Sequence, residues 1–235
     1  MTIPGFRTEA LAEGASPKWI DELATADPNH LLHVVRGLAP ADAVELVGGT
    51  VLRHLKPYEL PAGRPDDWST TAHAAIGADR MKDLLVAGQR GDWTFVYDAA
   101  GVTGWTPERA EMATVLSANG RAAGTSILTI NADSSFCYAE DGEIVIHIDA
   151  DDPKPTDDEV PDVLRAAIEA AGRADSEDED EDEDEDFLDV DANMRIACAL
   201  AGLTWTTGEF RAQPLLVGEV TSSYYYEVMA EMRSK

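Results

Sequence analysis

The sequence has few of the groups that build common catalytic and metal sites. Its two cysteines, Cys137 and Cys198, are far apart and lack CxxC spacing, which excludes a disulfide framework and a cysteine zinc site. No GxSxG, GxxxxGK[ST] or GxGxxG pattern occurs, so the usual nucleophile elbow and phosphate-binding loops are absent. No apolar run approaches the roughly 18 residues of a membrane-spanning helix. These absences favour a binding protein over an enzyme.

Positive charge is also scarce. The chain has 18 Lys and Arg against 45 Asp and Glu, a net charge of -27. Such a surface repels nucleic-acid phosphates and anionic lipids, so we expect no direct binding to nucleic acid or membrane. Basic proteins and cations are the attractive partners. The same bias also fits a high-GC or salt-adapted bacterium, in which it has no functional meaning.

Ten of the acids are consecutive, at residues 177–186, and without them the net charge is still -17. So many like charges cannot pack, which predicts a disordered loop at about residues 174–187. Two sharper interpretations are a nucleic-acid mimic or a docking tail for a basic partner. Weak calcium binding is a third, although the run lacks the glycine and the carboxylate spacing of a calcium loop.

The beginning of the sequence, MTIPGFRTEALAEG, lacks the basic and apolar regions of a secretory signal. We therefore expect a cytoplasmic protein. Residues 1–15 are predicted to be a flexible arm, and residues 16–235 a single α+β domain interrupted by the acidic loop.

The central stretch, residues 84–148, organises this domain. Residues 84–89 and 93–98 predict a hairpin, and three further strands are expected, the last two joined by an Asp-Gly hairpin signal: 125–131, 135–140 and 143–149. A helix is predicted from Thr106 to about residue 118. The pattern is typical of a mostly antiparallel sheet with helices packed on it.

The flanking segments predict further elements. Residues 30–38 are typical of a buried strand, and residues 50–82 of a variable loop with one short helix around 70–75. Short helices are expected to begin at Ser16, Pro40 and Thr206 or Thr207.

Two longer amphipathic helices are expected, over residues 159–171 and 191–203. The first would place one apolar face on the core, made of Val160, Val163, Leu164, Ile168 and Ala171.

Four stretches carry a family resemblance: VVRGLAPADAVELVGG, GDWTFVYDAAGVTGWTP, SSFCYAEDGEIVIHID and ANMRIACALAGLTWTTGEF. With them the chain resembles an actinobacterial family of uncharacterised proteins, a domain of unknown function. The resemblance implies a single α+β domain and implies no chemistry.

Few side chains are candidates for chemistry. Asp149, Asp151 and Asp152 follow a strand and have the oxygen ligands of a divalent-ion site, although acids are common at such ends. His30 and His33 would point to opposite faces of a strand, which excludes joint ligation. His147 is interpreted as a strand residue, and Cys137 as a small core residue. We expect no metal, cofactor or catalytic residue.

Our hypothesis is a non-enzymatic acidic module that engages a basic protein partner, in the manner of an immunity protein or inhibitor. The predicted partner-binding residues are acids and tryptophans: Asp92, Trp93, Trp105, Asp149, Asp151 and Asp152. One alternative is an enzyme or small-ligand binder whose site combines scattered residues, His147, Asp149, Asp92 and Trp93. Another is a structural subunit that assembles through the tyrosine-rich residues 224–226.

Overall fold

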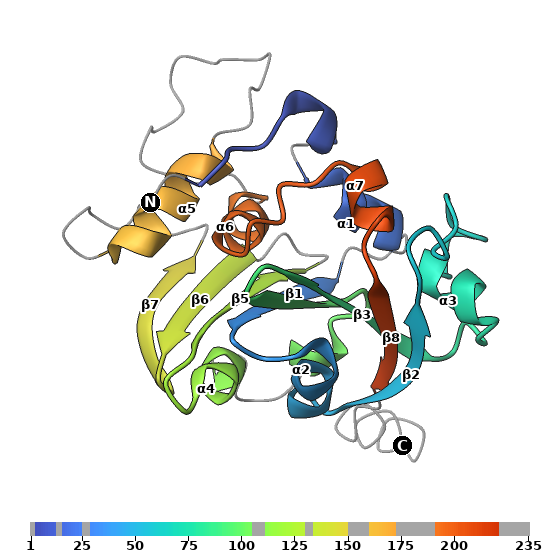
Figure 1. The fold of residues 1–235 in the computed structure, drawn as a ribbon, viewed down its shortest axis with the longest axis horizontal. Helices are drawn as coiled ribbons and strands as arrows, with labels where there is room; N and C mark the ends of the chain where they lie inside the picture. The colour runs from blue at the N-terminus through green and yellow to red at the C-terminus, as the bar shows by residue number, and fades with distance from the viewer. Residues whose placement is uncertain are drawn as a thin grey trace, which may run out of the picture.

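Eight antiparallel strands form one sheet in the order β2-β8-β3-β4-β1-β5-β6-β7 (Figure 1). This computed structural model describes residues 3–12, 16–24, 29–104, 111–129, 134–149, 160–172 and 191–220. The strands are β1 (His30–Arg36), β2 (Gly49–Leu55), β3 (Asp83–Arg90), β4 (Trp93–Asp98), β5 (Ala122–Leu128), β6 (Ser134–Glu140), β7 (Glu143–Asp149) and β8 (Leu215–Val220). The predicted α+β class is confirmed, and so are the two hairpins, β3–β4 and β6–β7.

Helices cover both faces of this sheet (Figure 1). They are α1 (Lys18–Leu23), α2 (Pro40–Leu46), α3 (Thr71–Ile76), α4 (Glu111–Ser117), α5 (Asp162–Ala171), α6 (Ala192–Leu200) and α7 (Thr207–Arg211), with 3-10 turns η1 (Thr8–Ala10) and η2 (Val102–Gly104). The main core lies on the face that α1, α5, α6 and α7 cover. A smaller core lies under α2 and α4. The predicted start of α4, at Thr106, lies outside the described residues.

The sequence did not reveal two of the strands, β2 and β8. Strand β2 is an edge strand with a mostly exposed surface, so it lacks the apolar pattern of a core strand. Strand β8 lies between β2 and β3 but contains Gly218, which weakens the strand pattern. The glycine has a packing reason, because a Cβ there would lie 2.9 Å from Cγ1 of Val44 in α2.

The main core is centred on Trp19. Its ring stacks on Phe210 at 4.9 Å between centroids and meets Phe95 edge-on at 5.5 Å. The indole Nε1 donates a hydrogen bond to the carbonyl of Leu203 at 3.3 Å. These contacts join α1, α7 and β4, three elements that are far apart in the sequence, so the core requires both ends of the domain.

Helix α6 corrects one prediction. The sequence indicated an amphipathic helix, but all nine residues of α6 are buried, including the polar Asn193 and Arg195. Helix α5 explains the difference, because it packs its own buried residues, such as Leu164 and Ala167, against α6. On α5, Val163 was predicted to face the core but is 37% exposed.

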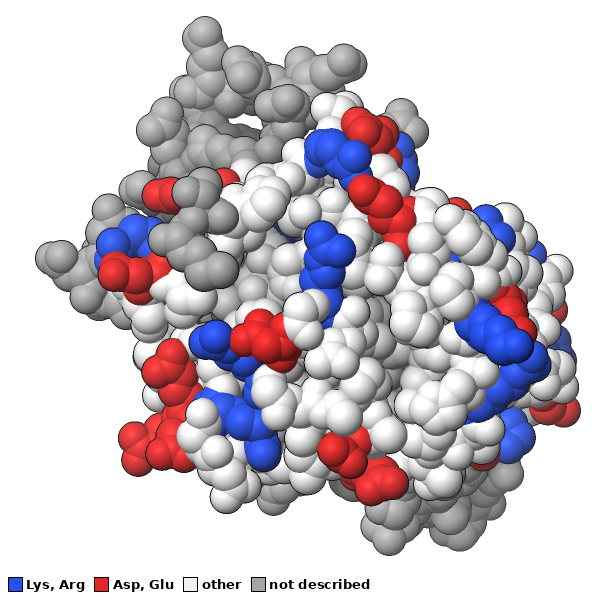
Figure 2. Space-filling view, in the orientation of Figure 1, with Lys and Arg blue, Asp and Glu red and all other residues white. Residues whose placement is uncertain are grey.

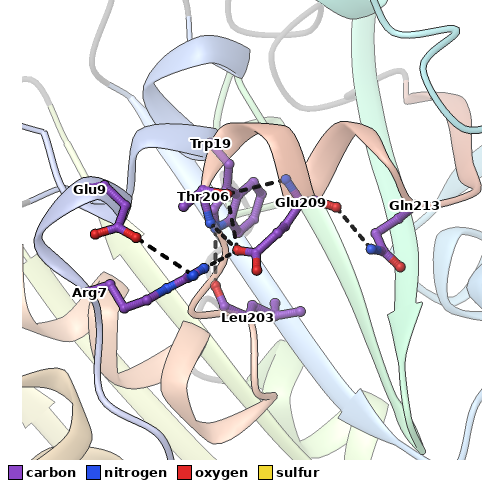
Figure 3. A network of polar contacts seen from close by, with 7 residues as sticks. All are labelled: Arg7, Glu9, Trp19, Leu203, Thr206, Glu209 and Gln213. Carbon is purple, nitrogen blue, oxygen red and sulfur yellow. Dashed lines mark hydrogen bonds and ion pairs between the residues drawn. The ribbon is translucent and has the colours of Figure 1, made fainter.

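The N-terminal segment packs on the domain. Ile3 and Phe6 contact the main core, and Ala10 is buried. Figure 3 shows Arg7 paired with Glu209 of α7. Glu209 also accepts a hydrogen bond from the Thr206 backbone, and the Glu209 backbone donates to Thr206, which confirms the predicted helix start as a capping box.

Substitution of Arg195 tests the packing of α5 on α6. The Arg195 guanidinium donates to two carbonyl oxygens at the end of α5, and replacement by methionine would leave them without these charged donors. We expect Arg195→Met to lower the free energy of unfolding by about 2 kcal/mol in urea titrations. The exposed control Lys56→Met should change it by less than about 0.5 kcal/mol. Equal effects of the two substitutions would contradict a structural role for Arg195.

Candidate functional site

Asp92 and Trp93 lie together at the β3–β4 hairpin. Arg36 Nε donates to Asp92 Oδ2 at 2.6 Å, and this bond is the main reason that the pKa of Asp92 lies below its ordinary value. Both side chains of the pair are exposed. Trp93 is half-buried and packs against the main core. The pairing with Arg36 reduces the negative charge that Asp92 offers to a partner.

Asp149 lies at the opposite end of the sheet. The strand register places Asp149 level with Asp98, across β1, β5 and β6. It is therefore about 17 Å from Trp93 along the strands and about 19 Å across them. His147 is exposed on β7, next to Cys137 of β6, which is buried as expected. The structure does not bring these residues into one site with Asp92, and Trp105, Asp151 and Asp152 lie outside the described residues.

Most of the negative charge belongs to one segment between β7 and α6. Residues 149–191 contain 21 of the 45 Asp and Glu but only three of the 18 Lys and Arg. This segment has a net charge of -18, two thirds of the total of -27. Asp149, Asp151 and Asp152 belong to it, whereas Asp92, Trp93 and Trp105 do not.

Arg195 binds the end of α5, which lies within this acidic segment. Its Nε donates to the carbonyl of Ala171 at 3.0 Å and its Nη2 to that of Gly172 at 3.1 Å. A cation at the C-terminus of α5 is favoured by the helix dipole. The backbone N–H of Arg195 donates a hydrogen bond to the carbonyl of Asp191, one helical turn earlier. Gly172 and Asp191, the described residues on either side of the acidic run, therefore both lie close to the first turn of α6.

The described part of the chain is much less acidic than the whole chain. Its residues include 13 Lys and Arg against 22 Asp and Glu. Figure 2 shows one face on which basic and acidic side chains are interspersed among uncharged ones. A basic partner would thus meet less attraction on this face than near residues 149–191.

A chain of buried polar groups lies under the face that α4 covers. The Thr103 hydroxyl donates to Asp98 Oδ2 at 2.8 Å, and Nε2 of His33 lies 2.9 Å from the same hydroxyl. Nδ1 of His33 lies 3.0 Å from the hydroxyl of Thr125. Burial lowers the pKa of His33 to about 4, so its ring is neutral at pH 7. All four side chains are buried, so they tie η2 to β1, β4 and β5 and reach no solvent.

His30 and His33 lie on opposite faces of β1, as the alternation predicted. His30 Nδ1 is 3.1 Å from the hydroxyl of Tyr97, which belongs to the main core. Within the described ranges no group of three or more His, Cys, Asp or Glu side chains is placed to hold a metal ion. No sequence pattern pointed to Thr103 and Asp98, because their pairing depends on the loop after β4.

Asp83 is the most strongly perturbed partly exposed acid. It begins β3, and burial, followed by the charges of Asp98 and Glu219, raises its pKa to about 6. Glu219 is paired with Lys82, whose charge does not reverse this shift. A carboxyl of this kind titrates near neutral pH, but its neighbours supply no nucleophile or ligand set.

The comparisons with known proteins show the family. Residues 15–223 match the model of a family of unknown function, DUF6461. The chain belongs to this family. The DUF6461 match spans all eight strands and α1 to α7, so the fold described above is that of the family region. The predicted resemblance to a domain of unknown function is confirmed.

No curated protein and no solved structure matched the chain. Among the helices that the structure describes, none has the length and apolar character needed to cross a membrane.

The shifted pKa of Asp83 predicts a pH dependence. Between its ordinary value of 3.8 and about 6, the folded protein holds a proton that the unfolded chain has lost. Stability therefore falls as the pH rises through this window, and Asp83→Asn removes the loss. Because Asp83 is partly exposed, we expect the variant to be more stable by only about 1 kcal/mol at about pH 7 and unchanged at about pH 3.5.

Urea titrations at both pH values measure this difference, with Asp67→Asn as the exposed control. A gain of the same size at both pH values would show that the charge of Asp83 is not its cause.

Proposed function

We propose that this DUF6461 protein is a non-enzymatic module that binds a basic protein partner through the acidic segment, residues 149–191. The observation that carries the proposal is the concentration of 21 of 45 acids in this one segment. A cluster of like charges creates a local potential that attracts and orients a basic partner before contact.

The anchoring of the segment supports the same role. Helix α5 interrupts the acidic segment and packs on α6, and Arg195 fixes the point where residues 173–190 begin. An acid next to one of these anchored ends acts on a partner at short range, whereas charges separated by more than about 8 Å are screened at physiological salt. A partner bound there would contact both the acids and the folded domain.

The other hypotheses have less support. A ligand site made of Asp92, Trp93, His147 and Asp149 would need residues from opposite ends of the sheet. A structural subunit assembled through residues 224–226 concerns a segment outside the described residues. We place the protein in the cytoplasm, in keeping with two buried cysteines, Cys137 and Cys198, that form no disulfide.

The partner is to be captured from nuclease-treated host lysate on the tagged full chain, and eluted with salt. Its association rate is then measured against salt concentration. We expect the rate to fall as salt rises, because the charges are screened. Replacing residues 177–186 by alternating Gln and Asn, at constant length, should lower the rate about tenfold at low salt.

A charge-matched pair of triple variants locates the effect. Asp182→Asn, Glu183→Gln and Asp184→Asn together should slow association about threefold. The control changes three exposed acids elsewhere, Asp42→Asn, Glu45→Gln and Asp67→Asn, and should leave the rate nearly unchanged. Tight binding that ignores salt, or equal losses in both triples, would contradict the proposal.

A further inference from the structure

Strand β7 is an edge of the sheet. Among the described residues it pairs only with β6, and its other side faces no strand. Its residues Glu143 to Val145 and His147 are exposed, with Ile144 at 47% and Val145 at 41%. An edge strand presents a row of backbone N–H and C=O groups that can pair with another chain.

The opposite edge, β2, differs in its side chains and its neighbours. Arg53 of β2 donates to the carbonyl of Ala75 in α3 and lies 3.8 Å from Glu59. Helix α3 lies beside β2 in Figure 1. Natural proteins block edges with basic residues, proline, bulges or covering segments, and both β2 and β7 contain a bulge. Strand β2 has a basic residue, Arg53, and a covering segment, α3, whereas the sequence of β7, EIVIHID, contains no Lys, Arg or Pro.

A bulge divides β7. Ile144 pairs with Ala139 and Ile146 with Tyr138, so Val145 is the extra residue. From Ile146 to Asp149 the register with β6 is regular. This regular half ends at Asp149, the first acid of the acidic segment, so a strand added there would lie beside Asp149.

We infer that the outer edge of β7 is a strand-addition site, and that its occupant is an extended, lysine- or arginine-flanked segment of the basic partner. The inference rests on the proposed function and names its contact surface. Backbone hydrogen bonds would supply affinity, and the side chains of β7 would supply selectivity. Glu143 and Asp149, at the two ends of the strand, match cations at the two ends of the occupant, and exposed Ile144 matches an apolar residue between them.

The charges argue against a second copy of this chain as the occupant. Antiparallel pairing of two β7 strands about Ile146 would place Glu143 opposite Asp149 of the other copy, twice. Like charges directly opposite each other destabilise strand pairs. Two chains that each have a net charge of -27 also repel each other at long range.

The test uses the isotope-labelled full chain and two end-blocked peptides, KTITVTIK and its acidic counterpart ETITVTIE. Backbone amide exchange is followed by NMR with and without peptide. We expect the cationic peptide to slow exchange at least tenfold at amides within residues 146–149 and to leave β2 unchanged. The acidic peptide should have no effect at either edge.

Two matched edge variants locate the site. Ile144→Lys on β7 and Leu52→Lys on β2 each add one positive charge at a similarly exposed position, 47% and 42%. We expect Ile144→Lys to raise the dissociation constant of the cationic peptide about tenfold and Leu52→Lys less than twofold. Urea titrations of both variants show that they remain folded.

Three results would overturn the inference. The first is cationic-peptide binding that Ile144→Lys does not weaken, or that protects amides elsewhere; this leaves the proposed function in place. The second is no binding of the cationic peptide, with partner capture then deciding the proposed function separately. The third is a dimer in sedimentation that Ile144→Lys disrupts, because the occupant would then be a second copy.

Discussion

The burial of α6 constrains the rest of this structure. A helix that is buried on every side must be covered on every side, so the sheet alone cannot complete its packing. Helix α5 supplies the second cover, and Arg195, buried within α6, donates to the carbonyls of Ala171 and Gly172 at the end of α5. A buried guanidinium is tolerated only with such acceptors. The contact thereby fixes the place where the most acidic part of the chain begins.

Most of the net negative charge lies in one segment of the chain rather than in the residues that form the sheet and its cores. The described residues form a three-layer domain of modest charge, while residues 149–191 contain two thirds of the net charge of -27. Inside the domain, the buried side chains of His33 and Asp98 both hydrogen-bond to the hydroxyl of Thr103. The ends of the chain from which this acidic segment continues, at β7, α5 and α6, are therefore at a distance from the β3–β4 hairpin with Asp92.

Local patterns predicted the elements whose surroundings are simple. Hairpins with Gly-Asp and Asp-Gly turns, and the helix start at Thr206 or Thr207, depend on neighbouring residues and were found from sequence. Strands β2 and β8 were missed because β2 is an exposed edge strand without an apolar pattern and β8 contains Gly218. The full burial of α6 was missed because α5, a separate helix, creates it. Contacts between elements that are distant in the sequence are also invisible in local patterns. The sequence therefore could not show that Asp92 pairs with Arg36 or that Asp149 lies at the other end of the sheet.

The central claim is that negative potential is concentrated beside α5 and the end of β7. Paramagnetic broadening of backbone amides by small cationic, neutral and anionic nitroxides measures this potential directly on the full chain, without a partner. The account predicts that the cationic probe, relative to the other two, broadens the amides of α5, the first turn of α6 and the end of β7 most strongly. Even broadening over the domain, or a maximum at the β3–β4 hairpin, would contradict it.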